Sequence, residues 1–140
     1  MKKDTAGAVW KGTVKEGNGV LSTKSNVLNG KMYSYNSRFQ NGEGTNPDEL
    51  LAASHAGCFA MATSLMLGKS GFTPDSLDAT AELSMNYEKL QIVSSHLTLK
   101  AKIPGITEEQ FQEIANNAKE NCPISKVLNC DITLDAKLEN

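Results

Sequence analysis

Two of the three cysteines in this sequence stand beside residues that could support thiol chemistry. Cys58 follows His55 by three residues in a predicted helix, so both side chains share one face and could interact directly. Gly57, beside Cys58, would let another backbone or a substrate approach closely. A cysteine among small apolar residues is also typical of a buried packing residue. The local sequence therefore leaves a reactive role and a packing role open for Cys58.

Cys122 has the stronger local argument for an acidic thiol. Pro123 is predicted to be the first residue of a helix, which makes Cys122 its N-cap. Free backbone N–H groups and the helix dipole favour a thiolate at such a position. The alternative is a capping cysteine with an unreactive side chain. Cys130 borders a predicted strand among apolar neighbours and is interpreted as a packing residue.

Arg38 is the only arginine in the chain, and it precedes two acidic residues in a predicted first helical turn. Its guanidinium is permanently charged and offers a planar fork of donors, so it could stabilise a thiolate and orient an oxygen acceptor. The alternative is that Arg38 lies in a loop and its side chain is simply solvated. Asp48 and Glu49 are also explained as acids that favour a helix N-terminus. His96, on the polar side of a predicted strand, is interpreted as a surface residue.

Two other uses of the cysteines have weaker support. The histidines and cysteines form no C-x-x-C or H-x-x-x-H pair, which a zinc site is expected to show. A Cys-His hydrolase would use His55 to activate Cys58, but its orienting group and oxyanion donors cannot be placed.

The N-terminal half is expected to hold a meander followed by a long helix. Gly-Asn-Gly and Asn-Gly breaks between strand-like runs predict three antiparallel strands within residues 7–37. Asn46 and Pro47 predict the cap and first position of a helix over residues 47–68. Apolar residues around nearly its whole circumference indicate a central buried helix. A membrane span is rejected, because its serine, threonine and alanine residues make it too weakly hydrophobic.

The C-terminal half is predicted to mix strands and helices over residues 76–138. Alternating residues predict strands at 77–87 and 92–103, and a capping box at Thr107 and Gln110 starts a helix. A short helix and a final alternating strand follow. Because 140 residues suit one core, we expect a single domain over the whole chain.

The charge balance and cysteine usage indicate an intracellular protein. The 14 basic and 16 acidic residues give a net charge of -2, so no overall positive field would recruit nucleic acid or anionic lipid. No apolar stretch follows the two N-terminal lysines, so the start does not resemble a signal peptide. Three cysteines do not suggest a secreted disulfide framework. We therefore expect a cytoplasmic protein that binds neither nucleic acid nor membrane.

Four motifs together resemble the OsmC (osmotically inducible protein C) family of peroxidases and its organic hydroperoxide resistance relatives. They are Arg38-Phe39, Gly44-Thr45-Asn46-Pro47-Asp48-Glu49-Leu50, Ala56-Gly57-Cys58-Phe59 and Asn121-Cys122-Pro123-Ile124-Ser125. The resemblance spans nearly the whole chain and is stronger to the OsmC branch. It implies an α/β (α+β) fold, with antiparallel sheets wrapped around central helices, in an intertwined homodimer whose active sites lie at the subunit interface.

The resemblance also implies the candidate catalytic residues. Cys58 matches the peroxidatic cysteine, Cys122 the resolving cysteine, and Arg38 the arginine that stabilises the reactive thiolate. The carboxylate that partners this arginine is usually a glutamate directly after the proline. That position here is Asp48, one methylene shorter, and Glu49 is the alternative partner.

The implied activity is a thiol-dependent peroxidase that reduces organic hydroperoxides to alcohols in a response to oxidative or osmotic stress. Hydrogen peroxide is a second candidate substrate. The Cys58 thiolate would become a sulfenic acid, and Cys122 would condense with it to a disulfide. No bound metal, haem or flavin is required, and dihydrolipoamide on lipoylated proteins is the favoured external dithiol. The alternatives are a redox sensor that uses the same disulfide and a Cys-His acyl transferase or hydrolase.

Overall fold

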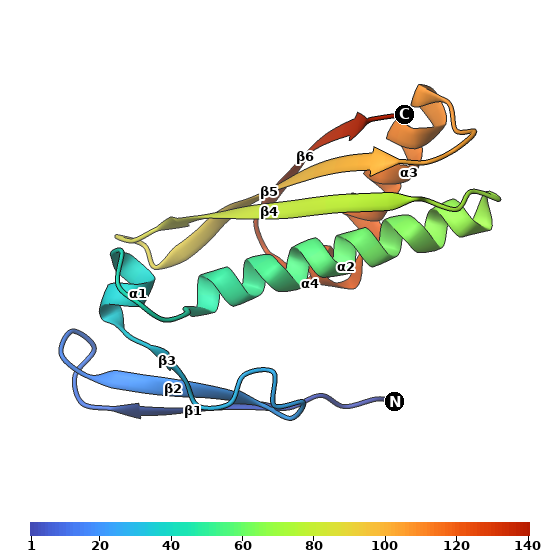
Figure 1. The fold of residues 1–140 in the computed structure, drawn as a ribbon. Helices are drawn as coiled ribbons and strands as arrows, with labels where there is room; N and C mark the ends of the chain where they lie inside the picture. The colour runs from blue at the N-terminus through green and yellow to red at the C-terminus, as the bar shows by residue number, and fades with distance from the viewer. The chain divides into compact units, whose positions relative to one another are not determined.

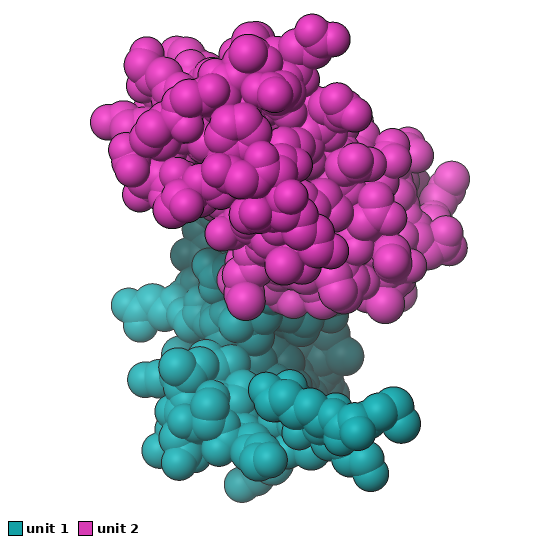
Figure 2. Space-filling view, turned by 90° about the vertical axis from the view of Figure 1, so that its right-hand side faces the viewer, with its two compact units in different colours: residues 1–50 teal, residues 51–140 magenta.

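The computed structural model describes all 140 residues, and the chain forms two compact units. Figure 2 shows residues 1–50 in teal and residues 51–140 in magenta. Each unit carries a three-stranded sheet, and helices account for most of the remaining regular structure. The predicted mixed α/β class is confirmed. The expectation of one domain over residues 1–140 stays a prediction.

The first unit begins with the predicted meander (Figure 1). Strands β1 (Ala6–Lys11), β2 (Asn18–Thr23) and β3 (Lys31–Tyr33) pair antiparallel in the order β1-β2-β3. Gly19 of β2 faces two aromatic rings, because a Cβ at this position would lie 2.6 Å from the Tyr33 ring and 2.7 Å from the Trp10 ring. The small residue lets these rings meet edge to face, with centroids 5.3 Å apart.

A short helix, α1 (Tyr35–Phe39), begins within residues 7–37, where only strands were predicted. Ser34 and Ser37 form a reciprocal capping box, with each side-chain oxygen accepting from the backbone N–H of the other residue. This local pattern outweighs the strand preference of the neighbouring tyrosines. As a result, Arg38 lies in the last turn of a helix rather than in a loop.

The long helix α2 (Pro47–Lys69) was predicted within one residue of its observed end. Asn46 caps it by accepting from the Glu49 N–H at 2.7 Å. Beyond the helix, Gly71 adopts the left-handed region at φ 86°, and the Phe72 N–H donates to the Leu67 carbonyl.

Only one stripe of α2 is buried, which corrects the expectation of a helix buried all round. Its members recur every four residues and are His55, Phe59, Thr63 and Leu67. The opposite side carries exposed apolar residues, including Met61 at 77% and Leu65 at 61% exposure. The sequence pattern could not separate burial within one chain from burial against another surface.

By length and composition, α2 could cross a membrane, with a mean hydropathy of 1.5 over its most apolar stretch. The sequence argument that this segment is too weakly hydrophobic was therefore wrong. A single helix of this kind is weak evidence for a span, because core helices of soluble proteins meet the same criterion.

The second unit contains β4 (Ser76–Asn86), β5 (Gln91–Lys102) and β6 (Asp131–Leu138), in the order β4-β5-β6. Strands β4 and β5 pair antiparallel, as expected. The β5–β6 pair is parallel, which corrects the expectation of purely antiparallel sheets. Helices α3 (Glu108–Asn121) and α4 (Pro123–Val127) form the crossover that returns the chain to the same end of the sheet.

The core of this unit lies where the buried stripe of α2 packs with β5 and α3. Its largest fully buried apolar side chains are Phe59, Leu67, Leu97, Leu99, Ile103 and Phe111. The capping box of Thr107 and Gln110 starts α3 as predicted. This core fixes α2 and the start of α4, the two segments that carry Cys58 and Cys122.

Candidate active site

The structure brings Cys58 and Cys122 together although they are 64 residues apart in sequence. The two side chains are close enough for Cys122 to raise the pKa of Cys58, and both are free thiols. Cys58 is partly exposed on α2, whereas Cys122 is fully buried at the N-cap of α4. A molecule from solvent would therefore reach Cys58 first, with Cys122 directly behind it.

The first turn of α4 contacts both sulfur atoms. The backbone N–H of Ser125 donates to the Cys122 sulfur at 3.3 Å, which confirms the predicted cap. The backbone of Ile124 forms a hydrogen bond with Cys58. Because α4 has only five residues, these individual N–H groups matter more than a helix dipole.

The surroundings of Cys58 disfavour its thiolate. Burial is the main cause that raises the pKa of Cys58, and the neighbouring Cys122 raises it further. The hydrogen bond from Ile124 opposes this shift but does not reverse it. The two thiols and their capping helix therefore do not supply the activation that a nucleophilic Cys58 would need.

A buried histidine connects Cys122 to the strand beside it. His55 is 0% exposed, and its Nδ1 lies 2.7 Å from Ser95 Oγ while its Nε2 lies 2.8 Å from Ser125 Oγ. The Ser125 hydroxyl in turn lies 3.2 Å from the Cys122 sulfur. We call Ser95, His55, Ser125 and Cys122 the histidine network. Both ring nitrogens thus meet serine hydroxyls, instead of the direct contact with Cys58 that was considered.

Sequence reasoning assigned no role to either serine. Ser125 did carry a signal, because it stands three residues after the N-cap cysteine, where a side chain can turn back toward the cap. Ser95 carried none, because its contact with His55 joins residues 40 positions apart.

Burial lowers the pKa of His55, which predicts a pH dependence of stability. When the pH falls below about 6.5, the unfolded histidine takes up a proton before the folded one does. The free energy of unfolding should therefore fall from that pH down to the lowered pKa of His55. Urea unfolding at a series of pH values would measure this decrease in the free energy of unfolding.

Two variants make this measurement specific to His55. His55→Gln should lose the pH dependence in this range, whereas His96→Gln, which changes a partly exposed histidine outside the buried network, should retain it. Equal slopes in the unaltered chain and His55→Gln would contradict the assignment.

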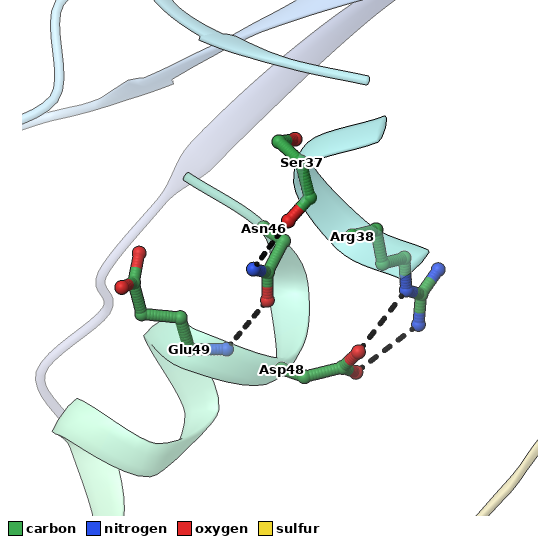
Figure 3. Close-up of polar contacts among 5 residues, drawn as sticks. All are labelled: Ser37, Arg38, Asn46, Asp48 and Glu49. Carbon is green, nitrogen blue, oxygen red and sulfur yellow. Dashed lines mark hydrogen bonds and ion pairs between the residues drawn. The ribbon is translucent and has the colours of Figure 1, made fainter. Parts of the chain in front are cut away.

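Arg38 and Asp48 form a two-point ion pair in the first unit (Figure 3). Arg38 Nε lies 3.3 Å from Asp48 Oδ2, and Arg38 Nη2 lies 3.2 Å from Oδ1. The carboxylate of Glu49 accepts instead from the Thr45 hydroxyl at 2.8 Å. The structure thus selects Asp48 over Glu49 as the partner of Arg38.

Asn46 holds the two helices of this ion pair together. Its side-chain oxygen caps α2 at Glu49, and its Nδ2 donates to the Ser37 carbonyl of α1 at 2.9 Å (Figure 3). The guanidinium of Arg38 is therefore fixed both by a carboxylate and by the turn that joins α1 to α2.

A pocket of about 200 Å³ lies beside Arg38 in the same unit. Its lining is mainly aromatic and consists of Trp10, Val14, Tyr33, Ser34, Tyr35, Arg38 and Phe39. The guanidinium carbon lies 5.3 Å from the centroid of the Phe39 ring. Such a pocket can hold an apolar group while a cation stands at its edge.

The candidate residues thus form two pairs, Cys58 with Cys122 and Arg38 with Asp48, which belong to different compact units. Cys130 is half-buried just before β6 and is not part of the hydrophobic core, contrary to the packing role expected of it. Burial and the nearby Asp131 raise its pKa. No group of three or more His, Cys, Asp or Glu side chains is arranged to hold a metal ion.

Comparison with known proteins gives consistent matches over most of the chain. The family model described as "OsmC-like protein" matches residues 40–137. The chain is 46% identical over 135 residues to "Peroxiredoxin OsmC" of Escherichia coli (strain K12), covering 95% of this chain and 94% of that protein. It is 29% identical over 121 residues to "Organic hydroperoxide resistance protein OhrB" of Bacillus subtilis (strain 168), covering 85% and 89%.

The fold is also shared with solved structures. An OsmC-like protein of unknown function from Vibrio cholerae superposes with a TM-score of 0.74, covering 97% of this chain and 99% of that one. At 15% sequence identity, this similarity concerns the fold alone. The expected α/β fold class is therefore confirmed, while the expected homodimer stays a prediction.

Proposed function

Because the chain belongs to the OsmC-like protein family, we propose that it is a thiol-dependent peroxidase that reduces organic hydroperoxides to alcohols. The contact between the free thiols of Cys58 and Cys122 carries this proposal. The names of its relatives, a peroxiredoxin and organic hydroperoxide resistance proteins, agree with it.

The proposed reaction begins at Cys58, because this thiol is the more accessible of the two. Its thiolate attacks the terminal oxygen of the hydroperoxide, the O–O bond breaks, and the alkoxide leaves as an alcohol after taking a proton. The resulting sulfenic acid at Cys58 then condenses with the Cys122 thiol, which releases water and forms a disulfide. An external dithiol reduces the disulfide and restores both thiols.

Arg38 is proposed to stabilise the Cys58 thiolate and orient the peroxide. This role meets a specific need, because burial and Cys122 raise the pKa of Cys58. Asp48 acts as a positioning residue, since its two contacts hold the guanidinium fork in one orientation. The aromatic pocket beside Arg38 would bind the alkyl tail of the substrate.

We propose that the protein works as a homodimer in the cytoplasm and needs no bound metal, haem or flavin. The exposed apolar side of α2 supports the dimer, because burying Met61 and Leu65 against a second copy would remove apolar surface from water. Sedimentation velocity tests this part of the proposal, and a monomer at micromolar concentration would contradict it.

Turnover with dihydrolipoamide tests the proposed function. A peroxidase should consume many equivalents of cumene hydroperoxide per chain, whereas a redox sensor should consume about one equivalent and stop. Thioredoxin with its reductase serves as the comparison reductant and should support slower turnover. Cys130→Ser is the matched cysteine control and should keep full activity, because Cys130 lies outside the thiol pair. Consumption limited to one equivalent with both reductants would contradict an enzymatic role.

A further inference from the structure

Within the histidine network, His55 and its two serine partners have no part yet in the proposed reaction. His55 has no exposed surface and stands between two serine hydroxyls, at 2.7 Å from Ser95 and 2.8 Å from Ser125. Ser125 Oγ lies 3.2 Å from the Cys122 sulfur, which contacts Cys58. An unbroken line of hydrogen bonds therefore runs from the buried histidine to the Cys122 thiol.

We propose that Ser125 and His55 form a proton relay that deprotonates Cys122 when it attacks oxidised Cys58. This inference rests on the proposed peroxidase function, because it concerns the second step of that reaction. Ser125 contacts the reacting sulfur directly and is a catalytic residue, whereas His55 acts through it and is a positioning residue.

The step balances without an outside reactant. The S–H bond of Cys122 breaks and its proton passes to Ser125 Oγ, while the hydroxyl proton of Ser125 passes to His55 Nε2. The Cys122 sulfur bonds to the Cys58 sulfur, and the S–O bond of the sulfenic acid breaks. The departing hydroxide takes the proton back from the network and leaves as water. The Cys58 sulfur is reduced from the oxidation state of a sulfenic acid to that of a disulfide, and the Cys122 sulfur is oxidised from a thiol to the same state.

The hydrogen-bond distances are compatible with proton transfer from Cys122 through Ser125 to His55. When the Nδ1–H of His55 donates to Ser95 Oγ, Nε2 carries the lone pair and can accept from the Ser125 hydroxyl. The Ser125 hydroxyl is then free to accept from the Cys122 thiol. In this tautomer the histidine can act as a base toward Cys122.

The other elements bring no competing buried charge to this histidine. Strand β5 contributes the Ser95 hydroxyl, while His96 projects to the opposite face by strand alternation. Helix α4 contributes Ser125 and Cys122, while Lys126 is exposed. Burial is the cause that lowers the pKa of His55, so the imidazole stays neutral and able to accept a proton at neutral pH.

A purely structural role for Ser125 is the competing explanation. The cap itself requires only the backbone N–H of Ser125, which already donates to the Cys122 sulfur. Removing the hydroxyl should therefore leave α4 capped. It should interrupt the line to His55 without removing either reactive thiol.

The test follows one oxidation cycle in Ser125→Ala and His55→Gln. Each protein receives one equivalent of cumene hydroperoxide, and samples are quenched with a sulfenic acid probe and a thiol alkylator before intact mass spectrometry. Formation of the Cys58 sulfenic acid should keep its normal rate, which also shows that the variant is folded. Its conversion to the disulfide should slow by about 100-fold, at the lower end of general acid-base effects.

A pH series separates the relay from a structural effect. Without the relay, disulfide formation depends on free thiolate and should rise about tenfold per pH unit around neutrality. The unaltered chain should show a much flatter profile and lose rate only at acidic pH, where His55 becomes protonated. Ser125→Thr retains a hydroxyl and should recover most of the rate.

Thr63→Val is the matched control. It also removes a buried hydroxyl, but this one lies on α2 and bonds only to the Phe59 carbonyl. It should form the disulfide at the normal rate. Normal disulfide rates and unchanged pH profiles in both Ser125→Ala and His55→Gln would overturn the relay. If the unaltered chain formed no Cys58–Cys122 disulfide at all, the proposed function would fail instead, so the two failures are distinguishable.

Discussion

Replacing Cys58 with serine is expected to abolish peroxide reduction, whereas replacing Cys122 with serine should stop the reaction after about one equivalent. The first change removes the thiolate, which a serine hydroxyl cannot replace as a nucleophile near neutral pH. The second leaves a partly exposed, oxidisable Cys58 but removes its partner. The two variants therefore differ in where the reaction stops.

Intact mass spectrometry after thiol alkylation distinguishes these outcomes. The unaltered chain should lose two alkylatable thiols on treatment with one equivalent of peroxide, through a Cys58–Cys122 disulfide. Cys58→Ser should lose none, and Cys122→Ser should gain oxygen at Cys58. Cys130→Ser provides the control, since its thiol lies outside the pair. Sustained peroxide turnover by Cys122→Ser would rule out the disulfide mechanism.

The sequence predicted most features that depend on residues a few positions apart. The Asn46 cap of α2, the capping box of α3 and the Cys122 cap of α4 were all found. Each rests on a side chain that bonds to the backbone within three or four residues, so its signal is local. The reciprocal bonds of Ser34 and Ser37 are equally local, but the strand-like tyrosines beside them concealed the short helix α1.

Features that depend on distant contacts were missed or left open. The parallel β5–β6 pair joins segments separated by two helices, and its direction follows from the crossover rather than from strand composition. The bond between His55 and Ser95 likewise joins a helix to a strand 40 residues away. The choice between Asp48 and Glu49 was open because both acids stand in one helical turn, and only their orientation assigns them different partners.

The order of attack by the two cysteines shows why local electrostatics was insufficient. The cap position alone nominated Cys122 as the more acidic thiol, and only the family resemblance assigned the first attack to Cys58. The structure adds a physical reason, because Cys122 is fully buried while Cys58 is partly exposed. Access therefore favours Cys58, although burial and Cys122 raise its pKa, and Arg38 is the group proposed to activate it.

Arg38→Met is expected to lower kcat/KM for cumene hydroperoxide by about 100- to 1,000-fold, the usual effect of removing a group that stabilises developing charge. The loss should lie in the oxidation of Cys58 and should shrink at high pH, where hydroxide forms the thiolate without the cation. Arg38→Lys keeps the charge but loses the planar fork that bonds Asp48 at two points, so it should recover only part of the rate.

Asp48 is expected to act through Arg38, and its variants separate orientation from charge. Asp48→Asn should lower kcat/KM by roughly 10- to 100-fold through misplacement of the guanidinium, and Asp48→Glu should retain most of the activity because the carboxylate remains. Glu49→Gln is the matched control, since that acid bonds Thr45 instead. Stopped-flow rates of Cys58 oxidation across pH would measure all of these effects. An Arg38→Met variant with the normal rate and pH profile would show that another group forms the thiolate.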